Sequence, residues 1–276
     1  MESGPRGRHR DGRIGSVAES AEDRYARWQW IHETAVMTGW DFGALGSRLV
    51  ADDPPWDFDL TCAKAMARLQ PCLDMGTGGG ERLSRLVKSV STVGGFISRR
   101  SSVHATEGWK PNLELATSAL EKYGIEVREY DSETGQPMPW PEDYFTLVMN
   151  RHESYDPAEL ARVIAPDGRF LTQQVDGTEA GEFRLWFGGR PEAPENQLGP
   201  CLEELEAQGF TITDADEWTG MMEFADVEAI IEYLAYTPWD VPGFTVADNL
   251  VALDRLATRR TPIEVTQKRF RIAAQR

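Results

Sequence analysis

Glycines at positions 76, 78, 79 and 80 follow the short apolar run Cys72-Leu73-Asp74-Met75. Leu83, Leu86 and Val87 then recur at helical spacing. This order predicts a buried strand, a tight turn and a helix. Glycine lets a ligand approach bare backbone, and the first turn of a helix presents unpaired N–H groups with a partial positive charge. The stretch therefore predicts a loop that binds a nucleotide-like cofactor.

Two common nucleotide loops do not fit this stretch. A dinucleotide fingerprint needs a third glycine at position 81, which is Glu81. A phosphate-binding P-loop ends in Gly-Lys-Ser/Thr, and the first lysine after these glycines is Lys88. What remains is a G-x-G-x-G pattern behind the acidic strand end at Asp74.

Two further acidic positions follow predicted strands. Glu107 ends a strand over 102–106, and Asp131-Ser132 follow a strand over 125–130. Ligands of open parallel sheets bind beyond the carboxyl ends of the strands, so these side chains should meet at one edge. A carboxylate at 107 can accept both hydroxyls of a ribose, and Asp131 is placed to accept an adenine amino group.

The segment after a fourth strand (144–150) is rich in polar side chains. Histidine titrates near neutrality, so His152, with Glu153, is the candidate base for an acceptor hydroxyl, phenol or amine. The alternative is that both residues hydrogen-bond the loop or cap a helix starting at 157. Arg151 can bind a substrate carboxylate as a fork, or it can pair with Glu153 or Asp156.

The glycine loop and acidic strand end resemble motif I of the class I S-adenosylmethionine (SAM) methyltransferases. Stretches 105–112, 150–155, 162–175 and 238–244 are similar to a largely uncharacterised bacterial group of that family. Thr146 and Asp167 depart from its pattern, where Asp and Gly are usual. The resemblance implies a Rossmann-like, seven-stranded, mostly parallel sheet whose last strand (263–273) is antiparallel. It also implies a set of SAM-binding residues: Asp74, Gly76, Thr77, Gly78, Gly80, Glu107, Trp109, Asp131, Ser132 and Asn150.

Helical segments flank the predicted α/β core. A helical pattern within 18–48 ends at the prolines of 54–55, and a second helix is expected over 60–69. We expect a disordered tail at 1–16, a helical cap at 17–70, the SAM-binding domain at 71–276, and a helical insertion at 220–258 acting as a lid. Trp109 is expected either beside the adenine or in the core. The residues expected to contact substrate are Arg151, Tyr155, Gln174, Trp239 and Phe244.

The amino-acid composition limits the binding partners that this chain is expected to have. The chain has 276 residues and a formal charge of −16, which repels phosphate backbones, so neither nucleic acid nor an anionic membrane is expected as a partner. Its three cysteines lack metal or disulfide spacing and favour a cytoplasmic location. The scattered histidines predict no metal, and no apolar run is long enough to span a membrane. The oligomeric state is left open, with a homodimer as one option.

Together these features predict a SAM-dependent methyltransferase that acts on an O or N atom of a small molecule. Two alternatives stay open. One is an RNA or protein methyltransferase, which would need a basic groove near the strand ends. The other is a SAM-binding protein with a different activity, such as a cyclase, a decarboxylase or a structural subunit.

Overall fold

The computed structural model describes residues 19–37, 42–93, 102–190, 193–259 and 262–276. The predicted tail at 1–16 lies outside these residues. The N-terminal half contains α1 (Ala21–Thr34), η1 (Phe42–Arg48), β1 (Leu49–Ala51), α2 (Phe58–Met66), β2 (Cys72–Met75), α3 (Glu81–Thr92), β3 (Val103–Glu107), α4 (Lys110–Glu121), β4 (Glu126–Glu129) and η3 (Ser132–Thr134). The C-terminal half contains β5 (Phe145–Arg151), α5 (Pro157–Val163), β6 (Ile164–Val175), α6 (Gly181–Phe187), α7 (Leu198–Ala207), β7 (Thr211–Phe224), α8 (Val227–Tyr236), η4 (Ala247–Asn249), α9 (Leu250–Ala257) and β8 (Ile263–Gln275).

The strands of the described residues form one eight-stranded sheet in the order β1-β7-β8-β6-β5-β2-β3-β4. Five strands, β4, β3, β2, β5 and β6, are parallel to one another. Strand β8 lies between β6 and β7 and runs antiparallel to both. The predicted Rossmann-like fold class, with its antiparallel last strand, is therefore confirmed. The sheet has one strand more than expected, because β1 pairs antiparallel with the far end of β7.

Two apolar layers cover the two faces of this sheet. Leu83, Leu86 and Leu120 of α3 and α4 pack on one face together with α2. Leu160 of α5 and Leu205 of α7 pack on the other. Strands β2 and β3 are buried along their whole length, which explains why the sequence reads as continuous strand runs with little alternation.

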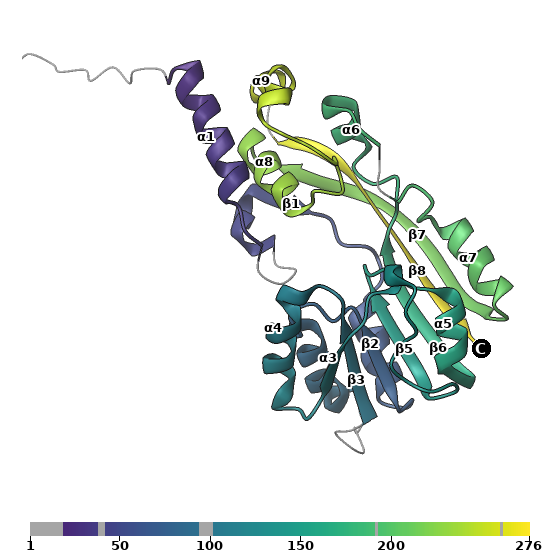
Figure 1. Ribbon diagram of the computed structural model, residues 1–276. Helices are drawn as coiled ribbons and strands as arrows, with labels where there is room; N and C mark the ends of the chain where they lie inside the picture. Colours follow the sequence, from purple (N-terminus) through teal and green to yellow (C-terminus); the bar gives the residue numbers. More distant parts are fainter. Residues whose placement is uncertain (1–18, 38–41, 94–101, 191–192, 260–261) are drawn as a thin grey trace, which may run out of the picture.

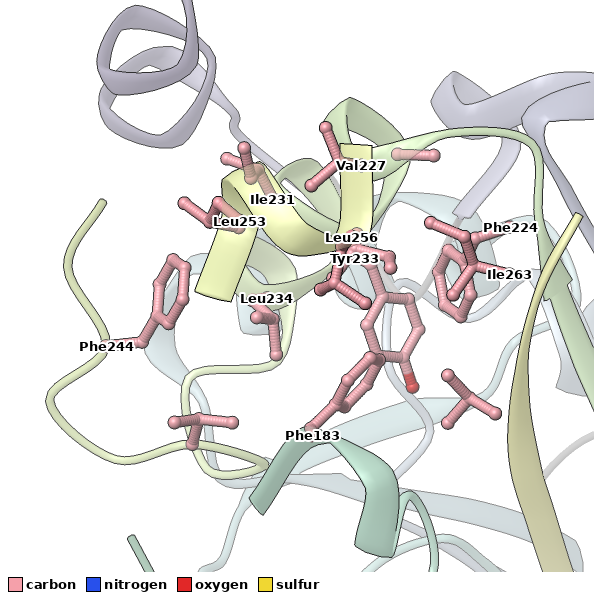
Figure 2. Packing of buried hydrophobic residues seen from close by; sticks show 14 of the residues in the cluster. Phe183, Phe224, Val227, Ile231, Tyr233, Leu234, Phe244, Leu253, Leu256 and Ile263 are labelled. Atoms are coloured by element: carbon pink, nitrogen blue, oxygen red, sulfur yellow. The ribbon is translucent and has the colours of Figure 1, made fainter. Parts of the chain in front are cut away.

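A second body, the helical lobe, consists of α1, η1, β1, α6, α8, η4, α9 and the adjoining ends of β7 and β8 (Figure 1). Its core is formed by Phe183, Phe224 and Tyr233 with aliphatic residues of α8 and α9 (Figure 2). The paired strands β7 and β8 run from the parallel sheet into this lobe and connect the two (Figure 1). The helical lobe lies above the carboxyl ends of the parallel strands.

Element boundaries differ from the sequence predictions in two places. Strand β7 continues to Phe224, so the boundary predicted at 220 lies inside this strand. The middle of β7 carries polar side chains on both faces, so it lacks the alternation of apolar and polar residues that predicts a strand. Pairing with β8 keeps this segment extended. In the region 17–70, α1 packs in the helical lobe, whereas α2 packs on the sheet beside α3.

Candidate cofactor and active site

The glycine loop joins β2 to α3 as predicted. Gly76, Gly78 and Gly80 all have positive φ (66°, 62° and 83°), a conformation that glycine adopts without strain. A Cβ at Gly80 would lie 3.0 Å from Leu120 Cγ, so packing against α4 explains this glycine without a ligand. A Cβ at Gly76 would overlap the side chain of Glu153, which lies directly over the loop.

Asp74 positions the loop from inside the protein. Its Oδ2 accepts a hydrogen bond from Thr77 Oγ1 at 2.9 Å, and its Oδ1 pairs with Arg82 at 3.0 Å. Arg82 also donates to Asp59 of α2 at 2.8 Å. Both Asp74 oxygens therefore have partners within the chain, and Asp74 shapes the turn of the loop instead of offering a free acceptor.

Glu107 stands at the end of β3, beside the glycine loop. It accepts from the backbone N–H of Gly78 at 2.7 Å and of Trp109 at 2.8 Å, one at each carboxylate oxygen. Each oxygen keeps acceptor capacity, because a carboxylate offers about four lone-pair sites. Burial raises the pKa of Glu107, against the opposing effect of these N–H donors. The side chain of Trp109 is 49% exposed, so the alternative of core packing is wrong for this residue.

Asp131 lies close to the Glu107 turn, since a Cβ at Gly108 would come within 3.0 Å of Asp131 Cβ. Its Oδ1 accepts from the Glu133 N–H at 2.9 Å and caps η3. Its Oδ2 accepts no hydrogen bond from the described residues. Ser132 Oγ lies 2.8 Å from Ser154 Oγ and ties η3 to the loop after β5. The acids after β3 and β4 thus meet at one edge, as the parallel sheet predicts.

Two buried amides at this edge have unused hydrogen-bonding groups. Nδ2 of Asn150, at the end of β5, has no partner within the described residues. Asn112, in the first turn of α4, is fully buried and neither of its amide atoms has a described partner. Ala116, one turn later on the same face of α4, lies against Gly80. Asn112 was not among the residues predicted from the sequence, although its place just after the Glu107 turn is a usable signal.

His152 follows β5 in the left-handed region, with φ of 61°, which is uncommon outside glycine. Its Nε2 lies 3.1 Å from Nε2 of Gln173. Although the ring is reached by solvent, protein surrounds it closely enough that desolvation, the largest effect, lowers its pKa well below 6.5. Arg269, Arg151 and Arg82 act in the same direction. His152 is thus a neutral imidazole at pH 7.

Glu153 has the opposite character. Burial raises its pKa to about 7, and the carboxylates Glu107, Asp131 and Glu133 add to the shift. Its side chain lies over Gly76, as noted above. The four acids form the acidic edge, which we define as Glu107, Asp131, Glu133 and Glu153. A ligand with positive charge and hydrogen-bond donors would relieve their mutual repulsion.

The predicted substrate contacts are not gathered at one place. Tyr155 packs edge-on against Phe170, against the core on the α5 side. Phe244 is buried in the helical lobe against Phe187 (Figure 2). Gln174 is buried and donates to Asn150 Oδ1 at 2.7 Å, which makes it a structural support for β5.

The remaining two predicted substrate contacts keep accessible surface. Trp239 is 38% exposed. Arg151 pairs with Asp59, at 3.7 Å, and not with Glu153 or Asp156 as the alternative held. The described residues contain no group of three metal-type ligands and no helix with the length and apolarity needed to cross a membrane.

Comparisons with known proteins bear on the fold. The Rossmann-like sheet with its antiparallel strand β8 is also found in a solved structure described as a methyltransferase. The chain is 22% identical over 187 residues to the uncharacterised methyltransferase YcgJ of Bacillus subtilis strain 168, covering 64% of this chain and 66% of that protein, just under two thirds. No model of a protein family matches the sequence.

Solved structures show the same fold. A Bacillus halodurans C-125 protein described as a candidate methyltransferase superposes with a TM-score of 0.54 at 16% identity, covering 79% of this chain and 99% of that one. The YcgJ structure gives 0.53 at 18% identity, covering 79% and 97%. A Deinococcus radiodurans R1 protein of unknown function gives 0.51 at 19% identity, covering 82% and 90%. The predicted resemblance to the class I methyltransferases is confirmed in sequence and in fold.

Proposed function

We propose that this protein binds SAM at the acidic edge and transfers its methyl group to an O or N atom of a small molecule. The observation that carries this proposal is the convergence of the strand-end acceptors on the glycine loop. SAM carries a sulfonium, an ammonium group, two ribose hydroxyls and an adenine amino group. All of these are positive or can donate hydrogen bonds, so they match an acceptor-rich, negatively charged edge.

Different residues bind different groups of SAM. Glu107 accepts the two ribose hydroxyls while the Gly78 and Trp109 N–H groups fix its orientation. Asp131 Oδ2 accepts the adenine amino group, and the exposed ring of Trp109 lies beside that base. When bound, SAM supplies an electrophilic methyl group on a sulfonium. The chain must then hold the acceptor atom in line with it, within about 3–3.5 Å.

A hydroxyl, phenol or ammonium acceptor also has to lose a proton. His152 is neutral at pH 7 and lies at the end of β5, beside the acidic edge, so it takes the proton from the acceptor atom. Glu153, whose pKa is raised to about 7, is the second group able to hold that proton. A small-molecule acceptor fits the charge of −16, and three buried free cysteines fit a reducing cytoplasm.

A labelled-methyl acceptor screen tests the proposal. Purified protein and methyl-labelled SAM are incubated with pooled small metabolites, with bulk RNA and with total protein in separate reactions. We expect label in the small-molecule pool alone, and a matched Glu107→Ala reaction without it. Label transferred to RNA or protein would refute the small-molecule acceptor, and SAM binding without transfer to any pool would favour the SAM-binding alternative.

A further inference from the structure

Strand β8 carries a polar band on the face that also bears the core of the helical lobe. Side chains two residues apart share a face, so Ile263 to Ala273 form one row. Ile263 and Val265 are buried in the helical lobe, and Ala273 packs on the parallel sheet. Between them the row consists of Gln267, Arg269 and Arg271. Apolar side chains at these three places would have joined the two cores into one, so the polar break marks a surface between the lobes.

The neighbouring strands extend this band toward the site. Arg271 lies directly opposite Gln173 of β6, and Arg269 lies opposite Trp218 of β7, which places the side chains of each pair on one face. Gln173 donates to His152 at 3.1 Å. The band therefore leads from the helical lobe directly to the candidate base.

Arg151 approaches from the same face. Its only described ion pair is the long contact with Asp59 of α2, at 3.7 Å. Asp59 is already engaged by Arg82 at 2.8 Å. Nε of Arg151 is buried and has no partner within the described residues. A buried guanidinium N–H without an acceptor is costly, and an anion would satisfy it.

Three arginines contribute positive charge around His152. Arg269, Arg151 and Arg82 all act to lower the pKa of His152, after the larger effect of desolvation. Arg269 donates to Glu179 and to the Lys268 carbonyl from one nitrogen and to the Gln267 amide oxygen, at 3.1 Å, from a second. A guanidinium has five N–H groups, so Arg269 keeps N–H groups for a ligand. In a chain of charge −16, this local positive field stands in contrast to the acidic edge.

We propose that the methyl acceptor is a small organic anion, whose carboxylate or phosphate group is bound by Arg151 and Arg269 beside His152. This inference rests on the proposed function and names the substrate class of the same site. The site then has two electrostatic halves. The acidic edge after β2, β3 and β4 holds the cationic cofactor, and the arginines around the end of β5 and the middle of β8 hold the anionic acceptor.

The test uses the full chain and inorganic phosphate as the probe. Thermal unfolding is followed at constant ionic strength while chloride is replaced by phosphate, with and without saturating S-adenosylhomocysteine. We expect a phosphate-dependent rise in Tm of about 3 °C at tenfold excess over the dissociation constant. The rise should be lost in Arg151→Gln and retained in Arg128→Gln, a control of similar exposure on β4, at the far edge of the sheet (37% and 35%).

Arg269 is tested with its partner removed, because Glu179 would otherwise be left buried and unpaired. The double variant Arg269→Gln/Glu179→Gln should also lose the phosphate response while still binding S-adenosylhomocysteine. An equal rise in wild type and Arg151→Gln, or no rise in wild type, would overturn the anionic acceptor. Failure of wild-type protein to bind S-adenosylhomocysteine would instead refute the proposed function, so the two failures are distinguishable.

Discussion

Nε2 of Gln173 lies 3.1 Å from Nε2 of His152, and Oε1 of the same amide accepts from Trp56 Nε1 at 2.8 Å. An indole nitrogen only donates, so Trp56 fixes the orientation of the amide. Gln173 must then donate to His152. The Nε2 of His152 is consequently the acceptor, and its proton resides on Nδ1. To act as the base, His152 must exchange the hydrogen bond that Nε2 accepts from Gln173 for the proton of the methyl acceptor.

The first prediction concerns the charge of His152. In the wild-type protein the imidazole should remain neutral to well below its ordinary pKa of 6.5, and kcat/KM should show no inflection from it near pH 6.5. Gln173→Glu keeps an acceptor for Trp56 but places a carboxylate beside the ring, which raises the pKa of His152. The variant should lose activity at pH 6–7 and recover it at higher pH. Histidine NMR titration reads this directly, and a wild-type pKa near 6.5 would contradict it.

The second prediction concerns Glu153. Its pKa of about 7 in the folded chain, against an ordinary 4.5, means that the folded state keeps a proton that the unfolded state has lost. The stability of the free protein therefore falls as pH rises from about 4.5 to 7. Glu153→Gln should stabilise it at pH 8 by at most about 3 kcal/mol and have almost no effect at pH 4. Urea unfolding at both pH values measures the difference.

Glu153 also links pH to cofactor binding. The cationic cofactor favours the charged carboxylate, so SAM affinity should increase as pH rises through 7 in wild type. Glu153→Gln should have a SAM affinity independent of pH in that window. A pH-dependent affinity that persists in the variant would assign the effect to another group.

The third prediction separates packing from backbone strain in the glycine loop. Gly80 and Gly135 both have positive φ, 83° and 66°, and a Cβ added at Gly80 would lie within 4 Å of Leu120 and Ala116, whereas one added at Gly135 would have no neighbour within 4 Å. The positive φ costs each alanine variant about 1–2 kcal/mol. Gly80→Ala should cost about 1–3 kcal/mol more, from the contact with α4. Equal losses of unfolding free energy in the two variants, measured by urea unfolding, would show that α4 moves aside for the added methyl group without an energetic penalty.

The fourth prediction concerns Asn112. Because its amide is buried without a described partner, Asn112→Leu should leave the free protein equally stable or more stable. If the amide serves the cofactor, the same variant should weaken SAM binding about tenfold. Unfolding and calorimetry on one protein sample separate these effects. Loss of stability with unchanged SAM affinity would make Asn112 a purely structural residue.

The sequence predicted the parallel part of the sheet well, because its central strands β2 and β3 are short buried runs, the first followed by a glycine and the second ended by an acid. It also predicted the meeting of Glu107 and Asp131, since parallel strands place their carboxyl ends together. It failed at β7, whose polar middle faces the space between the lobes, and at Tyr155 and Phe244, whose rings pack in two different cores. Aromatic composition alone does not reveal which core a ring joins. The contact of Asp59 with Arg151 was equally out of reach, because it joins α2 to β5 across the sheet.

Calorimetric titration with SAM tests the central claim most directly. Wild-type protein should bind SAM with a dissociation constant below 1 mM, of order 10 μM, the range of many enzyme–substrate constants. Glu107→Ala should weaken it at least tenfold, since two charge-assisted hydrogen bonds are lost. Glu129→Gln, which removes an exposed carboxylate at the end of the neighbouring strand, should bind as wild type does. Absence of SAM binding in wild type, or equal affinity in wild type and Glu107→Ala, would contradict the assignment of the acidic edge as the cofactor site.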